Sequence, residues 1–164
     1  MKAFLIITLV FILQISLRAQ EPDQKFIELK QVINKINPEV DFNDKVIFIT
    51  VWKSTDAESR EINKEAYRVY KIYEKAKLKN GEKGTVFISL NLDTDEQIRA
   101  FAIGKDGLEA SVVYSDLQVL ESLRLHYNIT NSQNTIVFDK IGTVQYTNIA
   151  KNDLFSSLRN LITR

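Results

Sequence analysis

An α/β domain with a central mixed sheet and helices on both of its faces is what the sequence predicts. Two short, nearly continuous apolar runs, KVIFITVW at 45–52 and TVFISLNL at 85–92, are typical of strands buried on both sides. Segments with apolar residues at helical spacing precede, separate and follow these runs, and such alternation favours parallel strands. A turn at Asp139–Gly142 between two further strand patterns adds an antiparallel hairpin.

The amino-terminal segment differs from the rest of the chain. A basic start at Met1-Lys2 precedes an apolar run, AFLIITLVFIL, of about 11 residues, whereas a membrane-spanning helix needs roughly 20. This pattern predicts a signal peptide over residues 1–19, cleaved after Ala19, and one exported domain over residues 20–164. We expect a periplasmic or extracellular protein with no stable membrane span after cleavage; a retained membrane anchor is the alternative. No cysteine follows, which excludes a lipid attached through one.

Two helices are predicted around the first strand. Phe26, Leu29, Ile33 and Ile36 have helical spacing and predict a helix over residues 24–36, which Asn37-Pro38 ends. A longer helix follows over residues 56–78, started by the capping-box pair Thr55 and Glu58 and ended by Asn80-Gly81. One apolar stripe along this helix faces the core and comprises Ile62, Ala66, Val69, Tyr70, Tyr73 and Ala76.

The carboxyl-terminal half continues the alternation. A helix is predicted over residues 95–103, ending near Gly104, followed by a short strand over residues 110–114. The next helix covers residues 117–126 and places Leu117, Leu120 and Leu123 near one face. The hairpin strands are predicted over residues 135–138 and 143–149, and a closing helix over residues 153–162.

Composition and charge exclude several functions. The 164 residues hold 22 Lys and Arg against 21 Asp and Glu, and this balance gives no general attraction to nucleic acid. The chain contains no cysteine, so it has no thiol nucleophile, no disulfide and no thiolate metal site. We expect no cofactor and no metal centre, because no phosphate-binding glycine-rich loop or spaced set of metal ligands is present.

Three segments in order resemble the exported TlpA/ResA-like thioredoxin family of bacteria. KVIFITVWKSTDAESREI matches the family's strand, catalytic motif and helix, and TVFISLNLDTDEQIRAFAIGKDGL matches its second strand, acidic turn and following helix. YNITNSQNTIVFDKIGTV matches its cis-proline and hairpin region. The resemblance implies a thioredoxin-like fold that extends over most of the domain.

The same resemblance shows a degenerate site. Asp56 stands at the position of the nucleophilic cysteine, Ser59 at that of the second cysteine, and Gln133 at that of the cis-proline. A serine hydroxyl cannot replace a thiolate in disulfide exchange, so we expect no such activity. By analogy with the fold, the loop from Trp52 through Thr55 to Ser59, beside residues 131–134, is the predicted contact surface for a partner.

Other candidate sites have simpler explanations. His126 is the only histidine and has no evident catalytic partners. Asp93 to Glu96 are explained as the N-cap of the next helix. The lysines at 71, 75, 77, 79 and 83 are explained by the carboxyl end of the long helix, and Tyr67, Tyr70 and Tyr73 by core packing.

Three hypotheses about function remain. The leading one is a non-catalytic binding or accessory module of the cell envelope, whose protein or peptide partner the sequence does not identify. The second is an enzyme that uses a non-cysteine site around Asp56. The third is a pseudo-enzyme that pairs with an active thioredoxin-like paralogue.

Overall fold

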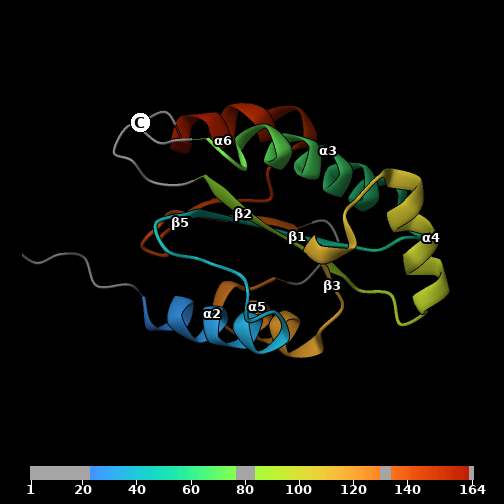
Figure 1. Ribbon diagram of the computed structural model, residues 1–164, viewed down its shortest axis with the longest axis horizontal. Helices are drawn as coiled ribbons and strands as arrows, with labels where there is room; N and C mark the ends of the chain where they lie inside the picture. Colours follow the sequence, from blue (N-terminus) through green and yellow to red (C-terminus); the bar gives the residue numbers. More distant parts are fainter. Residues whose placement is uncertain (1–22, 77–83, 130–133, 163–164) are drawn as a thin grey trace, which may run out of the picture.

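A five-stranded mixed sheet forms the centre of the structure (Figure 1). The computed structural model describes residues 23–76, 84–129 and 134–162. The strands are β1 (Val46–Trp52), β2 (Thr85–Asn91), β3 (Val113–Tyr114), β4 (Asn134–Phe138) and β5 (Val144–Thr147), in the order β3-β2-β1-β4-β5. β1 is parallel to β2 and β2 to β3, whereas β4 is antiparallel to both β1 and β5. The predicted mixed sheet is therefore confirmed.

Helices cover both faces of this sheet, as the sequence predicts (Figure 1). α3 (Ala57–Tyr73) and α6 (Leu154–Ile162) pack on one face, against a core that includes Phe48 and Phe87. α2 (Gln24–Ile36) and α5 (Leu117–Tyr127) pack on the other face, around Ile47 and Ile49. All seven residues of β1 are buried, because this central strand is covered on both sides.

Aspartate side chains begin four of the helices. Asp23, Asp56, Asp95 and Asp116 are the N-caps of α2, α3, α4 (Glu96–Asp106) and α5, and each accepts a main-chain N–H of its helix's first turn. These N–H groups have no partner within the helix, so a carboxylate there satisfies them and interacts favourably with the helix dipole. Asp95 confirms the predicted N-cap within residues 93–96.

The long helix is shorter than predicted. α3 ends at Tyr73, with Glu74 as its C-cap, and not at Leu78. Gly84, which has φ +61, directly precedes β2 and lies close to the end of α3. A Cβ added at Gly84 would come within 2.2 Å of the carbonyl oxygen of Glu74. The chain entering β2 therefore passes directly against the end of α3. Asn80-Gly81, the predicted end signal, lies outside the described residues.

Other boundaries also differ from the prediction. α4 continues through Gly104 to Asp106, because Gly107 adopts the left-handed conformation (φ +68) that ends it. Residues 110–112 form a 3-10 helix, η1 (Ala110–Val112), which leaves only two residues for β3. β5 ends at Thr147, two residues early. A second 3-10 helix, η2 (Lys151–Asp153), precedes α6.

Two predicted core residues are exposed. Ile36 is 40% exposed at the last position of α2, and Leu117 is 75% exposed at the first position of α5. A residue at the very end of a helix extends past the neighbouring elements, so helical spacing alone overestimates its burial. The remaining core positions of both helices, such as Leu29 and Leu123, are buried as predicted.

Within the described residues, no helix is both long enough and apolar enough to cross a lipid bilayer. The predicted signal peptide lies outside them.

Candidate functional site

The loop that joins β1 to α3 is held by the residues that the sequence singled out. Trp52 ends β1 and is fully buried. Asp56 begins α3, and its Oδ1 accepts the main-chain N–H groups of Glu58 (3.1 Å) and Ser59 (3.3 Å). The prediction that Asp56 lies at the start of the long helix is confirmed. Thr55, predicted as the capping residue, is exposed and only precedes the cap.

The Ser59 side chain forms hydrogen bonds with the backbone of the loop. Its side chain is buried, and its Oγ accepts the N–H of Lys53 at 3.2 Å and lies 3.2 Å from the carbonyl oxygen of Asp56. Both partners lie within the β1–α3 connection, so the hydroxyl closes this loop onto the first turn of α3. In this arrangement the hydroxyl is a structural group, with no free path to a substrate.

A buried polar network lies beneath the loop, on the α3 side of the sheet. Asn63 of α3 accepts hydrogen bonds through Oδ1 from the hydroxyls of Thr50 (2.6 Å) and Ser89 (2.7 Å). Ser89 Oγ in turn accepts the indole N–H of Trp52 at 2.7 Å. Because Thr50 and Ser89 face each other in the β1–β2 ladder, one amide side chain can bridge the two strands. The network fixes the orientation of the Trp52 ring.

Sequence reasoning missed this network, although a signal was present. Thr50 and Ser89 are polar residues within strands that are otherwise almost wholly apolar. A buried polar side chain needs a partner, so two such residues on adjacent strands predict a bridging group. The partner, Asn63, lies in the middle of α3 and shows no pattern of its own.

Asp93 connects the end of β2 to the same loop. Its Oδ2 accepts the N–H of Ser54 at 2.7 Å and the side-chain amide of Asn91 at 2.9 Å. Partial burial opposes ionisation of this carboxyl, but the hydrogen bonds from Ser54 and Asn91 and the charge of Lys53 outweigh it, so the pKa of Asp93 is lowered. Asp93 is therefore a structural carboxylate.

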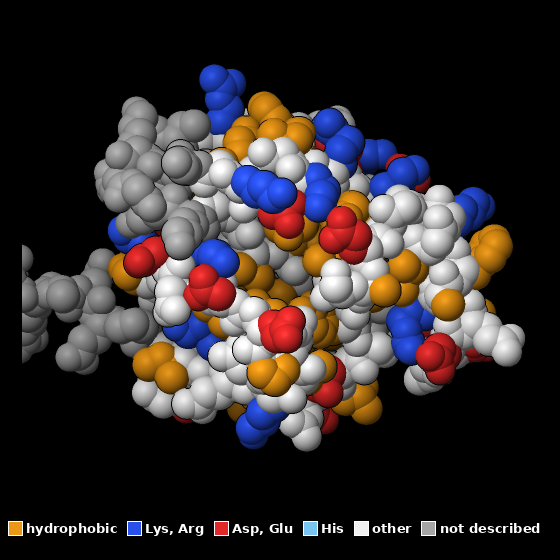
Figure 2. All heavy atoms as spheres, viewed as in Figure 1, with side chains coloured by type: hydrophobic (Ala, Val, Ile, Leu, Met, Phe, Trp, Pro, Cys, Tyr) orange, Lys and Arg blue, Asp and Glu red, His pale blue; other side chains and the backbone are white. Residues whose placement is uncertain are grey.

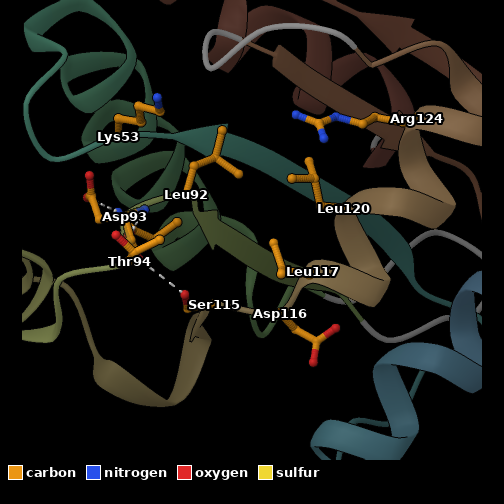
Figure 3. A pocket seen from close by; sticks show the side chains of 10 residues that line it. Lys53, Leu92, Asp93, Thr94, Ser115, Asp116, Leu117, Leu120 and Arg124 are labelled. Atoms are coloured by element: carbon orange, nitrogen blue, oxygen red, sulfur yellow. Dashed lines mark hydrogen bonds between the residues drawn. The ribbon is translucent and has the colours of Figure 1, made fainter.

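A cavity of about 550 Å³ opens beside this loop, at the carboxyl ends of β1, β2 and β3 (Figure 3). Leu92, Leu117 and Leu120 give it apolar walls. Lys53 follows β1 and Arg124 comes from α5, so two cationic side chains border the cavity from different elements (Figure 3). Crevices at this end of parallel strands are common ligand sites in α/β folds.

The charged side chains around the cavity differ in whether they already have partners. Asp93 is occupied by Ser54 and Asn91, and Asp116 caps α5 by accepting the N–H groups of Gln118 (2.7 Å) and Val119 (3.0 Å). Within the described part of the chain, neither Lys53 nor Arg124 forms a salt bridge. The cavity therefore offers a ligand apolar surface and two cationic side chains without an ion pair, alongside two carboxylates whose oxygens already accept hydrogen bonds.

The structure brings together only part of the predicted contact surface. Trp52, Thr55, Asp56 and Ser59 lie in one loop, but Trp52 and Ser59 are buried, which leaves Thr55 as its exposed member. Gln133 and residues 131–132 lie outside the described residues. Asn134 pairs with Val51, next to Trp52, at the end of β4 that adjoins this loop.

Among the secondary candidates, His126, Lys71 and the three tyrosines make structural contacts. His126 lies with Nε2 3.4 Å from Glu28 Oε2, and in the described ranges no three His, Asp or Glu side chains form a group that could hold a metal ion. Lys71 pairs with Glu74 (2.8 Å) and Glu109 (3.0 Å). Tyr67, Tyr70 and Tyr73 are buried in the core, as predicted; the lysines at 77, 79 and 83 lie outside the described residues.

Comparison with solved structures defines the fold as a thioredoxin fold. One similar structure is the thioredoxin domain of a thiol-disulfide oxidoreductase from Bacteroides vulgatus. The match covers 75% of this chain and 83% of that domain, with a TM-score of 0.60 and 16% identity. A thiol-disulfide oxidoreductase from Bacteroides fragilis is also similar: the match covers 73% of this chain and 83% of that one, with a TM-score of 0.57 and 24% identity.

A secreted disulfide oxidoreductase from Mycobacterium tuberculosis, homologous to Escherichia coli DsbE, is also similar (TM-score 0.54, 10% identity, 73% of this chain and 84% of that one). No protein-family model and no curated protein matches the sequence. At these identities the likeness establishes the fold, and the activities belong to the neighbours. The fold resemblance predicted from the sequence is confirmed, and the absence of cysteine is consistent with a degenerate member of this group.

Proposed function

We propose that this chain is a non-catalytic thioredoxin-fold module, exported to the cell envelope or beyond, that binds a protein partner at the carboxyl edge of its sheet. One observation carries the proposal: a chain with no cysteine keeps the capped loop, the buried Trp52 and an open cavity in one place. Thiol–disulfide exchange by its own side chains is chemically impossible without a thiol. What remains at this edge is a surface for binding.

The character of the cavity supports a protein segment as ligand. Leu117 is 75% exposed at the cavity and provides an apolar contact, while Lys53 and Arg124 provide positive charge on either side. An apolar side chain next to a carboxylate would complement both features. The partner is thus expected to present an acidic and apolar segment.

An enzyme centred on Asp56 is less well supported. Its carboxylate already accepts two main-chain N–H groups at the start of α3, and its neighbour Ser59 is buried against the loop backbone. Neither group is arranged as a nucleophile with an adjacent base. A pseudo-enzyme that pairs with a thioredoxin-like paralogue remains within the proposal, as one identity for the partner.

Site-specific photo-crosslinking in intact cells tests the proposal. A photoreactive amino acid at Leu117 should give a discrete adduct with one protein, whereas the same group at Gln145, exposed on β5 at the other edge of the sheet, should not. Charge reversal at Lys53 and Arg124 should weaken the Leu117 adduct severalfold. Equal adducts from Leu117 and Gln145, or a Leu117 adduct that charge reversal leaves unchanged, would contradict the proposal. Mass spectrometry of the adduct distinguishes a paralogue from another partner.

A further inference from the structure

Strand β2 has a complete partner on one side only. β1 pairs with all seven of its residues, from Thr85 to Asn91, whereas β3 pairs with just Ser89 and Leu90. In the part of the chain that the structure describes, no strand therefore lies beside residues 85–88 on the side away from β1.

The main-chain groups that face this open side can be assigned. The N–H of Val46 donates to the carbonyl of Gly84 (3.4 Å), and the N–H of Leu92 donates to the carbonyl of Trp52 (2.9 Å). Main-chain groups alternate between the two sides of a strand, so the even-numbered residues of β2 face β1. Thr85 and Phe87 consequently direct their N–H and carbonyl groups to the open edge.

A cavity of about 360 Å³ lies along this edge. Thr85, Val86 and Phe87 form part of it, Val40 and Lys45 come from the connection between α2 and β1, and further walls come from the end of α3 and from η1. In Figure 2, in which the sheet lies between the upper and lower helices, hydrophobic side chains appear in a hollow near the centre of the view, with charged side chains around it. The edge of β2 therefore lies at the bottom of this cavity.

An unsatisfied hydroxyl lies at the same place. Thr85 lines the cavity and is only 4% exposed, and its Oγ1 has no hydrogen-bond partner among the described residues. A buried hydroxyl without a partner costs free energy, which an occupant with a polar group at this point would recover.

We propose that this cavity binds an extended segment of a partner protein, which adds to the open edge of β2 as a short strand. Main-chain hydrogen bonds to Thr85 and Phe87 would hold it, as in other cases of strand addition. This site is separate from the cavity at the carboxyl edge, and its occupant need not be the same protein.

The shape of the cavity favours a single segment over the sheet edge of a second copy. Thr85 and Phe87 are 4% and 2% exposed, so a folded sheet edge could not reach their main chain past the surrounding walls. β3 occupies the neighbouring position in the sheet from Ser89 onward, and η1, which precedes Val113 in this parallel pairing, borders the cavity at the level just before Ser89. The added strand is therefore limited to the stretch beside Thr85 to Phe87, about three residues, or about 10 Å at 3.3 Å per residue.

Charges on the rim indicate the chemistry of this segment. Lys45 pairs with Asp41 (3.2 Å), and Glu74 pairs with Lys71 (2.8 Å). Lys75 also lines the cavity, is exposed, and forms no salt bridge within the described ranges. A segment with β-branched residues would favour the extended conformation needed to pair with β2, and one acidic side chain could pair with Lys75.

Amide hydrogen exchange tests the open edge with an internal control. In the free protein, the amide protons of Thr85 and Phe87 should exchange at least about tenfold faster than those of Val86 and Ile88, which face β1. If the two sets exchange equally slowly, the edge is already covered by the protein's own chain, and the proposal is wrong.

A designed peptide tests the binding. The probe is acetyl-Thr-Val-Glu-Val-Thr-amide, added to the isotope-labelled protein and followed by NMR. Exchange at Thr85 and Phe87 should slow on the order of tenfold, and one of two versions of the peptide, N-methylated on alternate residues in opposite phases, should lose this effect. No change up to the peptide's solubility limit, or no loss with either methylated version, would overturn the proposal.

Matched serine variants locate the site. Ser111→Trp places a large ring in this cavity and should abolish the peptide's effect, whereas Ser115→Trp, at an exposed serine of the carboxyl-edge cavity, should leave it unchanged. Lys75→Glu should weaken binding of the acidic peptide severalfold and leave a Glu-to-Gln peptide unaffected. The reverse pattern between the two serine variants would assign the peptide to the other cavity and refute the proposal.

Discussion

Asp56 and Ser59, which the sequence resemblance aligns with the two cysteine positions, both form hydrogen bonds with the backbone. The carboxylate accepts the amides that open α3, and the hydroxyl closes the preceding loop. A helix start needs an acceptor for its free N–H groups whatever chemistry the loop performs. This requirement explains the carboxylate at Asp56, whereas the Ser59 hydroxyl serves the loop by accepting the N–H of Lys53.

Substitution of Asp56 tests this structural role. Asp56→Ala should lower the free energy of unfolding by about 0.5–2 kcal/mol through loss of the cap. Asp56→Asn keeps an accepting oxygen and should lose only the charge contribution, about 0.3–1 kcal/mol. Thr55→Ala, at the exposed neighbour, should change it by less than about 0.5 kcal/mol. Denaturant unfolding at neutral pH measures all three, and a more stable Asp56→Ala would instead favour a strained functional carboxylate.

The lowered pKa of Asp93 leads to a prediction about how stability depends on pH. Because its pKa is lowered in the folded protein, its stabilising contribution is present above the unfolded pKa of about 3.9 and is lost as pH falls through the lower folded value. Asp93→Asn should therefore destabilise the protein at neutral pH, and the difference from wild type should shrink in acid. Urea unfolding at several pH values from 2 to 7 measures this; a pH-independent difference would show that the charge of Asp93 is irrelevant.

At the scale of elements, contacts between chain segments decide the effect of a glycine. Gly142, in the β4–β5 turn, has φ +89, and an added Cβ would come within 2.2 Å of the Phe26 ring of α2. Gly104, inside α4, has no atom within 4 Å of an added Cβ. The first glycine allows the hairpin to pack on α2, whereas the second has no such role.

These two glycines should respond oppositely to alanine. Gly142→Ala should destabilise by about 1–3 kcal/mol, through strain at positive φ and overpacking against Phe26. Gly104→Ala should stabilise by up to about 1 kcal/mol, because alanine is the better helix former. Thermal or denaturant unfolding of both variants measures the signs. A destabilising Gly104→Ala would mean that the space around Gly104 is not open, as it is in this structure.

At the scale of the whole molecule, a thioredoxin fold persists without the chemistry usually associated with its neighbours. With no cysteine in the chain, an insulin-reduction assay with dithiothreitol should give the rate of the protein-free control. A cysteine-containing thioredoxin run in parallel confirms that the assay responds. A clear rate enhancement by this protein would contradict the prediction.

Export is a second prediction at this scale. The basic start and short apolar run predict that the mature chain begins near Gln20, after cleavage at Ala19. Amino-terminal sequencing of the protein recovered from its native cells, together with fractionation, measures this. Intact Met1 on membrane-bound protein would show instead that the segment is kept as an anchor.

The sequence by itself determined the α/β class, the two central parallel strands, the helix that begins at Asp56, and the absence of thiol chemistry. Each of these depends on local information, because apolar runs, helical spacing and capping residues act over a few neighbouring positions. The predicted end of the long helix was wrong for the complementary reason, because the distant residue Gly84 lies against it. The predicted end of α4 was wrong because Gly107, and not Gly104, adopts the left-handed conformation that ends the helix.

Only the tertiary structure decided where a ligand could bind. The carboxyl-edge cavity depends on Lys53 and Arg124 bordering it from different elements, and the Asn63 network depends on a helix lying over two strands. The open edge of β2 exists because β3 is too short to cover it. Contacts between residues distant in sequence are set by packing of whole elements against one another, and no local pattern of residues encodes that geometry.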